Sequence, residues 1–153
     1  MTAIQRVAAI PAAAACLLFT ASATIHGDGQ RSAVNQELAA ARAATARYHD
    51  VNEALADGYI DMGVNPGEGS AIEFVNFDII DCTLDAEQPE ALRYVLSGGR
   101  LRLIGVEYVI PMACAPEPPE DFLPGAGEWE PEPGVPVWNL PVFLWSGKSI
   151  ERR

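Results

Sequence analysis

Basic residues are scarce in this chain. Its 153 residues include 10 Lys and Arg against 21 Asp and Glu, which gives a net charge of −11. A protein this acidic repels the phosphates of nucleic acids and the anionic surfaces of membranes. We therefore expect no nucleic-acid partner and no electrostatic attachment to a membrane.

Histidine is also scarce, since the chain contains two. Zinc and copper sites in proteins depend on His and Cys ligands, so a His-rich centre is excluded. The chain also lacks a phosphate-binding P-loop, a dinucleotide-binding Gly-x-Gly-x-x-Gly pattern and a Gly-x-Ser-x-Gly nucleophile turn. We predict no metal and no cofactor, and these absences favour a protein that is not an enzyme.

Long apolar runs are missing as well. The run from Val7 to Phe19 is shorter than the ~20 residues that span a bilayer. It follows Arg6 and precedes the small residues Ala21-Ser22-Ala23, which together have the three parts of a secretory signal peptide. We predict a signal peptide at 1–23, a secreted mature chain and no membrane span after cleavage. A retained anchor, or a lipoprotein modified at Cys16, is the alternative.

Cleavage leaves two cysteines, Cys82 and Cys114. An even pair in an exported chain favours a disulfide, which here closes a loop of about thirty residues and stabilises by roughly 3–4 kcal/mol in the chain-entropy model. A redox or metal pair is the alternative, although the spacing is far from Cys-x-x-Cys.

The segment 32–56 has apolar residues at steps of three or four, which predicts one long amphipathic helix. Ser32 is a suitable N-cap, and Asp57-Gly58 is a suitable stop, since glycine adopts the left-handed conformation at low cost. We expect this helix to cover one face of a small sheet.

Two strand regions follow. The segment 71–80 is rich in strand-forming residues, but its apolar residues change phase, which indicates either two covered faces or a bulge. The segment 91–110 is a hairpin around Gly98-Gly99, whose register pairs Leu96 with Leu101 and Tyr94 with Leu103. A second phase change predicts a bulge at Gly105.

The segment 111–136 holds eight of the twelve prolines and six acidic residues, with no Lys or Arg. This composition predicts a long, partly disordered loop. The segment 135–145 is the last strand, and Pro136 and Pro141 favour an edge position for it. The chain beyond the signal peptide, 24–153, is thus predicted to be a single α+β domain with a mainly antiparallel sheet.

Two residues are weak catalytic candidates. Glu73 lies between apolar neighbours in the strand region 71–80, and a carboxylate whose pKa is shifted by burial can act as a general acid or base. His49 has Glu53 one helical turn later, which is half of a metal site. The ordinary interpretations, a solvated helix face and a structural strand carboxylate, are favoured for both.

Aromatic residues are concentrated near the C-terminus. Trp138, Phe143 and Trp145 form either a binding surface or a set of core anchors. We take these three as candidate binding residues, together with the acidic loop 111–136. The partner they would contact is a protein or a small ligand.

Three segments resemble a family of exported bacterial proteins of unknown function. They are YHDVNEALADGY at 48–59, LDAEQPEALRY at 84–94 and GRLRLIGVEYVIP at 99–111. The resemblance implies two strands with histidines, but the matching stretches here are AIEFVN at 71–76 and LPVF at 140–143. This chain is therefore similar to a divergent member in which a histidine site is not expected.

These patterns lead to one preferred function and one alternative. The preferred function is an exported, non-catalytic binding or structural module. The alternative is a small hydrolase or metal-dependent enzyme that uses Glu73 with His49 or a nearby Asp. The enzyme requires Glu73 to lie within hydrogen-bond reach of another titratable group.

Overall fold

The computed structural model describes residues 22–63 and 71–145. Its helical elements are α1 (Ser22–Thr45), the 3-10 turn η1 (Ala46–His49), α2 (Val51–Ala56) and the 3-10 turn η2 (Phe77–Ile79). Its strands are β1 (Ile60–Asp61), β2 (Ala71–Val75), β3 (Ala91–Ser97), β4 (Arg100–Pro111), β5 (Glu130–Pro131) and β6 (Val137–Val142). The strands form one sheet in the order β1-β2-β3-β4-β6-β5, with every neighbouring pair antiparallel. The predicted α+β class with an antiparallel sheet is confirmed.

The expected signal peptide lies outside the described residues, apart from Ser22 and Ala23 at the start of α1. No described helix has an apolar stretch long enough to cross a membrane.

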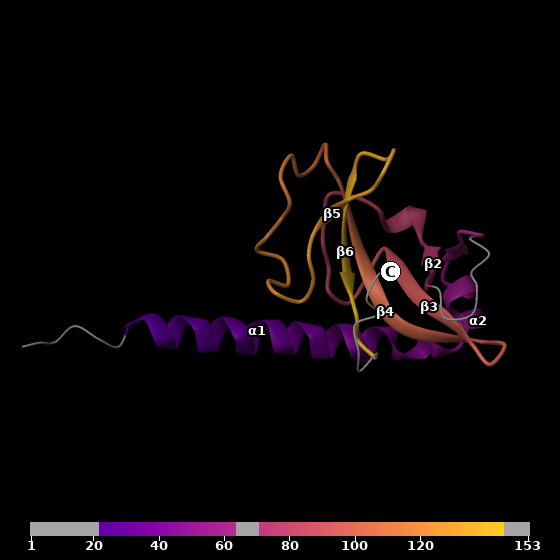
Figure 1. The fold of residues 1–153 in the computed structure, drawn as a ribbon, viewed down its shortest axis with the longest axis horizontal. Coiled ribbons are helices and arrows are strands. Elements are labelled where there is room, and N and C mark those ends of the chain that lie inside the picture. The colour runs from indigo at the N-terminus through magenta and orange to yellow at the C-terminus, as the bar shows by residue number, and fades with distance from the viewer. Residues whose placement is uncertain (1–21, 64–70, 146–153) are drawn as a thin grey trace, which may run out of the picture.

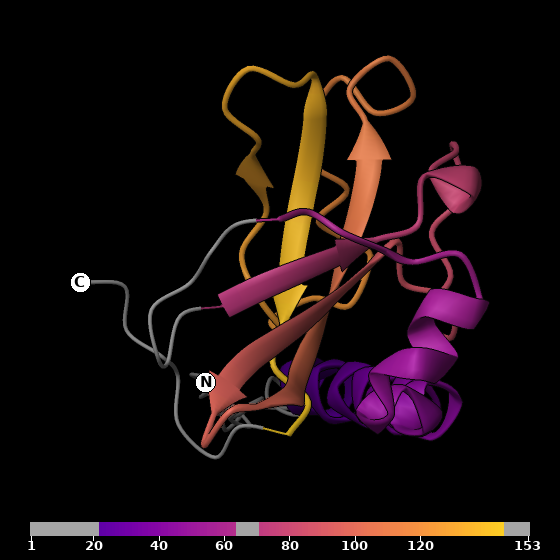
Figure 2. The ribbon, with the colours of Figure 1, turned by 90° about the vertical axis from the view of Figure 1, so that its right-hand side faces the viewer.

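The C-terminal half of α1 lies along one end of the sheet, and η1 and α2 continue around that end (Figures 1 and 2). Ala41 of α1 is fully buried, and the Arg42 Nε donates to the Leu144 carbonyl at 3.0 Å. One face of the sheet supplies most of the core, through Ile72, Phe74, Leu92, Tyr94, Leu103, Val106, Tyr108, Leu140 and Val142. Since side chains alternate along a strand, the other face carries the polar residues of these strands.

The prediction of one unbroken helix over 32–56 is wrong, because the helix stops at Thr45 and restarts at Val51. In a continuous helix the Tyr48 carbonyl would accept from the amide of Asn52. Here it accepts from the Tyr94 hydroxyl at 2.6 Å, and the Asn52 amide donates to the Asp50 carboxylate at 3.0 Å. Asp50 therefore acts as the N-cap of a new helix.

The predicted stop after 56 is confirmed. α2 ends at Ala56, and Gly58 has a φ of +93°, the left-handed conformation that glycine adopts without a Cβ clash. The Asn76 side chain donates to the Asp57 carbonyl at 3.0 Å, which satisfies a carbonyl at the helix end. The end of α2 is thus attached to the end of β2.

The hairpin register is as predicted, with Tyr94 opposite Leu103 and Leu96 opposite Leu101. The register shifts between Arg93 and Tyr94, which places the extra residue of the bulge beside Gly105. A Cβ at Gly105 would clash with the backbone oxygen of Val142, so the glycine permits close approach of β6.

The phase change in 71–80 has a different cause from either expected one. β2 ends at Val75, and the chain turns into η2, where the Asn76 side chain accepts from the amide of Asp78 at 3.1 Å. Phe77 is therefore an exposed turn residue rather than a strand residue.

The Pro-rich segment 111–136 packs against the rest of the protein, which differs from the expected partial disorder. Leu123 is 1% exposed, and Phe122 and Trp129 pack against the core. The predicted Cys82–Cys114 disulfide is present, with the two Cα atoms 5.3 Å apart. It joins this segment to the loop before β3.

The expected edge position of the last strand is only partly correct. β6 lies between β4 and β5, but β5 contacts it only at Asn139 and Trp138. Pro141 pairs with Glu107 of β4 and has no partner residue in β5. The proline thus occupies the part of β6 that needs no ladder bond on its outer side.

Three buried tyrosines attach the surrounding segments to the sheet. Their hydroxyls donate to backbone carbonyls in three hydrogen bonds, Tyr59 to Pro89 at 2.7 Å, Tyr94 to Tyr48 at 2.6 Å and Tyr108 to Ala86 at 2.8 Å. Burial raises the pKa of all three hydroxyls, which keeps them protonated as donors. A net hydrogen bond of this kind contributes about 1 kcal/mol.

We expect the substitution Gly105→Ala to destabilise the fold by about 1–3 kcal/mol, since the backbone of β6 must move away. Urea unfolding measures this loss. The matched control is Gly29→Ala in α1, where a Cβ meets nothing within 4 Å; it should be neutral or slightly stabilising. Equal effects of the two substitutions would contradict the close packing of β4 against β6.

Candidate functional site

A polar pocket lies where η1, α2 and the loop before β3 meet. Its volume is about 410 Å³, a size typical of small-molecule sites. We call it the Tyr48 pocket; its lining residues are Ala44, Arg47, Tyr48, Asp57, Tyr59, Asn76, Ile79, Glu87 and Gln88. These come from four parts of the chain, so the fold assembles the pocket.

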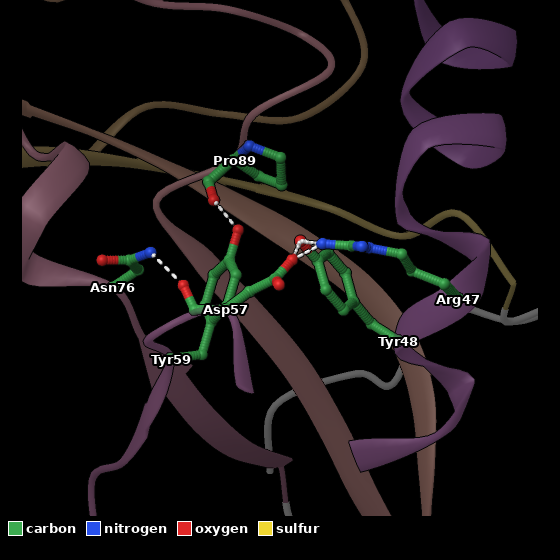
Figure 3. Close-up of polar contacts among 6 residues, drawn as sticks. All are labelled: Arg47, Tyr48, Asp57, Tyr59, Asn76 and Pro89. Atoms are coloured by element: carbon green, nitrogen blue, oxygen red, sulfur yellow. Dashed lines mark hydrogen bonds and ion pairs between the residues drawn. The ribbon is translucent and has the colours of Figure 1, made fainter. Parts of the chain in front are cut away.

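The centre of the pocket is a three-residue network (Figure 3). The Tyr48 hydroxyl donates to the Asp57 carboxylate at 2.8 Å and accepts from the Arg47 guanidinium at 3.1 Å. Arg47 also forms an ion pair with Asp57. The Arg47 side chain is 51% exposed and that of Asp57 33% exposed, so both charges remain accessible to a ligand.

The break in the helix creates this arrangement. Tyr48 is in η1, where the tightened turn directs its ring into the core, 5.2 Å from the ring of Tyr59. Asp57 and Tyr59 follow α2 around Gly58, and the Tyr59 hydroxyl donates to Pro89 (Figure 3). The residues that hold the pocket are thus themselves held by buried hydrogen bonds.

The chemistry of the pocket is that of a hydrogen-bonding surface. Arg47 supplies N–H donors, Asp57 and Glu87 supply carboxylate acceptors, and the Gln88 amide supplies both kinds of group. The Arg47–Asp57 pair is internally neutralised, and Glu87 leaves one excess negative charge in the pocket, which favours a neutral polar ligand over an anion.

Glu73, the first catalytic candidate, lies on the polar face of the sheet opposite Arg93. Its carboxylate is 3.3 Å from the Arg93 guanidinium, and Arg93 also forms a short, hydrogen-bonded ion pair with Glu107. Burial raises the pKa of Glu107 to about 7, although the Arg93 charge opposes the shift. The direct partner of Glu73 is thus an arginine, which does not exchange its proton near neutral pH, and this arginine lies between Glu73 and Glu107.

His49, the second catalytic candidate, has a different environment. Its ring packs edge-on against Trp145, with ring centroids 4.9 Å apart. Within the described residues, no hydrogen bond or ion pair joins His49 to Glu73. The Glu73–His49 pairing of the alternative enzyme is therefore not formed.

The three aromatic candidates do not share one surface. The Trp138 indole N–H donates to the Ala115 carbonyl at 3.0 Å, which anchors the Pro-rich segment. Trp145 packs against the core beside His49. Phe143 is exposed, with the Arg93 guanidinium 5.8 Å from its ring centre. Trp138 and Trp145 are thus partly buried anchors, and Phe143 is the most exposed of the three.

Sequence reasoning did not identify Arg47, Asp57 or Tyr59 as site residues. The segment 48–59 of the family resemblance contains Tyr48, Asp57 and Tyr59, and Arg47 immediately precedes it. Their convergence depends on the break at Asp50, which the helical period of the sequence conceals. Among residues 22–63 and 71–145, no group of three or more metal-ligating side chains is assembled.

Sequence reasoning also did not identify Glu90, which is a buried carboxylate like Glu107. Glu90 is 2% exposed and accepts a hydrogen bond from the amide of Val109 at 2.9 Å. β3 begins one residue later, at Ala91, so the Glu90 side chain continues the ladder of β4 in place of a backbone carbonyl. Burial raises the pKa of the Glu90 carboxyl to about 7, although the hydrogen bond from Val109 lowers it.

We expect the free energy of unfolding to fall as the pH rises. The native carboxyl of Glu90 holds its proton up to a pKa of about 7, whereas the ordinary value is 4.5. Its contribution to the free energy of unfolding is complete when the pH is below the ordinary pKa of 4.5. The contribution is lost as the pH rises through the native pKa of about 7. Glu107 acts in the same direction. Urea unfolding at about pH 5 and about pH 8 measures the fall.

The substitution Glu90→Gln should make this fall smaller, since the amide oxygen still accepts from Val109 and does not ionise. The control is Glu87→Gln, an exposed neighbour that should leave the pH dependence unchanged. An undiminished fall in the Glu90→Gln variant would show that this carboxyl is not the source.

Comparisons with known proteins identify no relative. No family model matches the chain, and neither a curated protein nor a solved structure matches it. The function has therefore to be inferred from the geometry of the chain itself.

Proposed function

We propose that this protein is an exported, non-catalytic binding module that holds a small polar ligand in the Tyr48 pocket. The observation that carries the proposal is the convergence of accessible donors and acceptors from separate segments in one pocket of about 410 Å³. Pockets with a few convergent polar groups are the usual sites of small ligands.

A binding role is favoured over catalysis by the state of the candidate residues. Glu73 is paired with Arg93, and His49 packs against Trp145. A general base must reach the proton that it removes. Among the described residues, Glu73 and His49 are not joined to each other, and Glu73 is connected to the titratable Glu107 only through Arg93. In the part of the chain that the structure describes, no hydrogen bond or ion pair joins Glu73 to His49 or to an Asp, so the alternative enzyme lacks a specific contact there.

The nature of the ligand follows from the pairing in the pocket. Arg47 and Asp57 neutralise each other, and the Tyr48 hydroxyl bridges them. A hydroxyl or amide group of a ligand donates to one member of the pair and accepts from the other. Polyols, sugars and neutral amides have groups of this kind.

Export is the second part of the proposal. The signal-peptide pattern at 1–23 supports it, and the Cys82–Cys114 disulfide is of the type that persists in oxidising compartments. Phe143 offers an additional exposed contact for a protein partner. Membership of the exported bacterial family that the sequence resembles stays a prediction.

The test uses protein purified from the culture medium without added metal or reductant. A native mass spectrum reports the N-terminal residue, expected to be Thr24, and any retained ligand. An NMR titration with glucose, inositol and glutamine should then shift amide signals around the pocket. The substitutions Arg47→Gln and Asp57→Asn should weaken binding of the responding probe by at least about tenfold, since each removes a charged hydrogen-bond partner.

A matched control is available in α1, where Arg31 and Asp28 form an ion pair 3.8 Å apart with side chains about 80% exposed. The substitutions Arg31→Gln and Asp28→Asn should leave binding unchanged. A bare mass together with no response to any probe would refute the binding site. Hydrolysis of a probe by the wild-type protein would refute the non-catalytic assignment.

A further inference from the structure

A second pocket, of about 740 Å³, lies between the start of α2 and the turn of the β3–β4 hairpin. We call it the hairpin pocket; its lining residues are His49, Asp50, Val51, Asn52, Ser97, Arg100, Leu101 and Arg102. The turn of this hairpin lies at the same end of the molecule as α2 (Figure 1). The hairpin pocket shares no lining residue with the Tyr48 pocket.

The distribution of positive charge distinguishes this pocket. Within residues 22–63 and 71–145, Arg31, Arg47 and Arg93 form ion pairs, and Arg42 donates to a backbone carbonyl. In the same part of the chain, the two remaining arginines, Arg100 and Arg102, have no ion pair and are exposed. Both line the hairpin pocket. The chain has a net charge of −11, and both described arginines without an ion pair lie at this one site.

The negative group in the pocket is already engaged. Asp50 accepts from the amide of Asn52 at 3.0 Å and from its side chain at 2.9 Å, which commits one carboxylate oxygen to the cap of α2. Two arginines against one carboxylate leave a positive excess before His49 is considered. The His49 ring is held against Trp145, and the hydroxyl of Ser97 adds a neutral donor.

From this arrangement we infer that the hairpin pocket binds a small organic oxyanion, a carboxylate or a phosphate ester, through Arg100 and Arg102. Planar guanidinium groups donate two parallel hydrogen bonds to such anions. Val51 and Leu101 supply an apolar wall for the carbon skeleton of the ligand. The volume exceeds what one inorganic ion fills, which is why the ligand is an organic anion.

The inference is independent of the proposed function, since the two pockets are lined by different residues. The test titrates the full mature chain with citrate, with glycerol 3-phosphate and with inorganic phosphate, at constant ionic strength maintained with chloride. Amide shifts of Ser97 and Arg102 and the fluorescence of Trp145 beside His49 report binding. The expected result is saturable binding of at least one organic anion, more tightly than inorganic phosphate.

The variants separate a specific site from general attraction of anions. The substitutions Arg100→Gln and Arg102→Gln should each weaken binding at least about tenfold. Both residues are exposed, so the fold should tolerate their loss. The matched control is Arg31→Gln, which removes one exposed positive charge from α1, and the variant Arg47→Gln tests independence from the Tyr48 pocket.

The preference among the three anions and the loss of binding in the variants decide whether the hairpin pocket is an oxyanion site. Preference for citrate identifies a carboxylate site, and preference for glycerol 3-phosphate identifies a phosphate-ester site. No saturable response to any of the three anions overturns the inference. An equal loss of binding in Arg31→Gln and Arg100→Gln also overturns it, because the attraction would then reflect net charge alone.

Discussion

The hydrogen bond from the Tyr94 hydroxyl to the Tyr48 carbonyl is the interaction on which the two pockets depend. It joins β3 to η1 and occupies a carbonyl that a continuous helix would use for its own next turn. A new helix, α2, then begins with Asp50 as its N-cap. Consecutive residues of the break then diverge, so that Arg47 and Tyr48 line one pocket while His49 and Asp50 line the other.

The sheet contributes a different constraint, because charged side chains are buried against its strands. Arg93 is shared between Glu73 and the buried Glu107, and Glu90 is used as a strand extension. Carboxylates in such positions are desolvated, and their partners compensate for only part of that cost. Glu90 and Glu107 both make structural contacts, and burial is the main cause of their raised pKa values.

Local signals predicted some elements well and failed where distant contacts decide. The β3–β4 hairpin was predictable because its Gly98-Gly99 turn and its alternating side chains agree on one register. The end of α2 was predictable because Gly58 relieves a local steric limit. The break at Asp50 was not, since its cause, Tyr94, lies 46 residues from Tyr48. The candidate site was not predictable for the same reason, because Arg47 and Asp57 become neighbours only through this break in the helix.

Composition and local pattern alone determined the acidic character, the antiparallel α+β class, the hairpin register and the pairing of Cys82 with Cys114. Each of these depends on charge counts, on turn chemistry or on parity, which are properties of short segments or of the whole composition. Tertiary structure alone decided that the Pro-rich segment packs through Leu123, and that Arg100 and Arg102, which have no ion pair among the described residues, line one pocket. Those outcomes depend on contacts between segments far apart in the chain, whose free energy exists only once the sheet has formed.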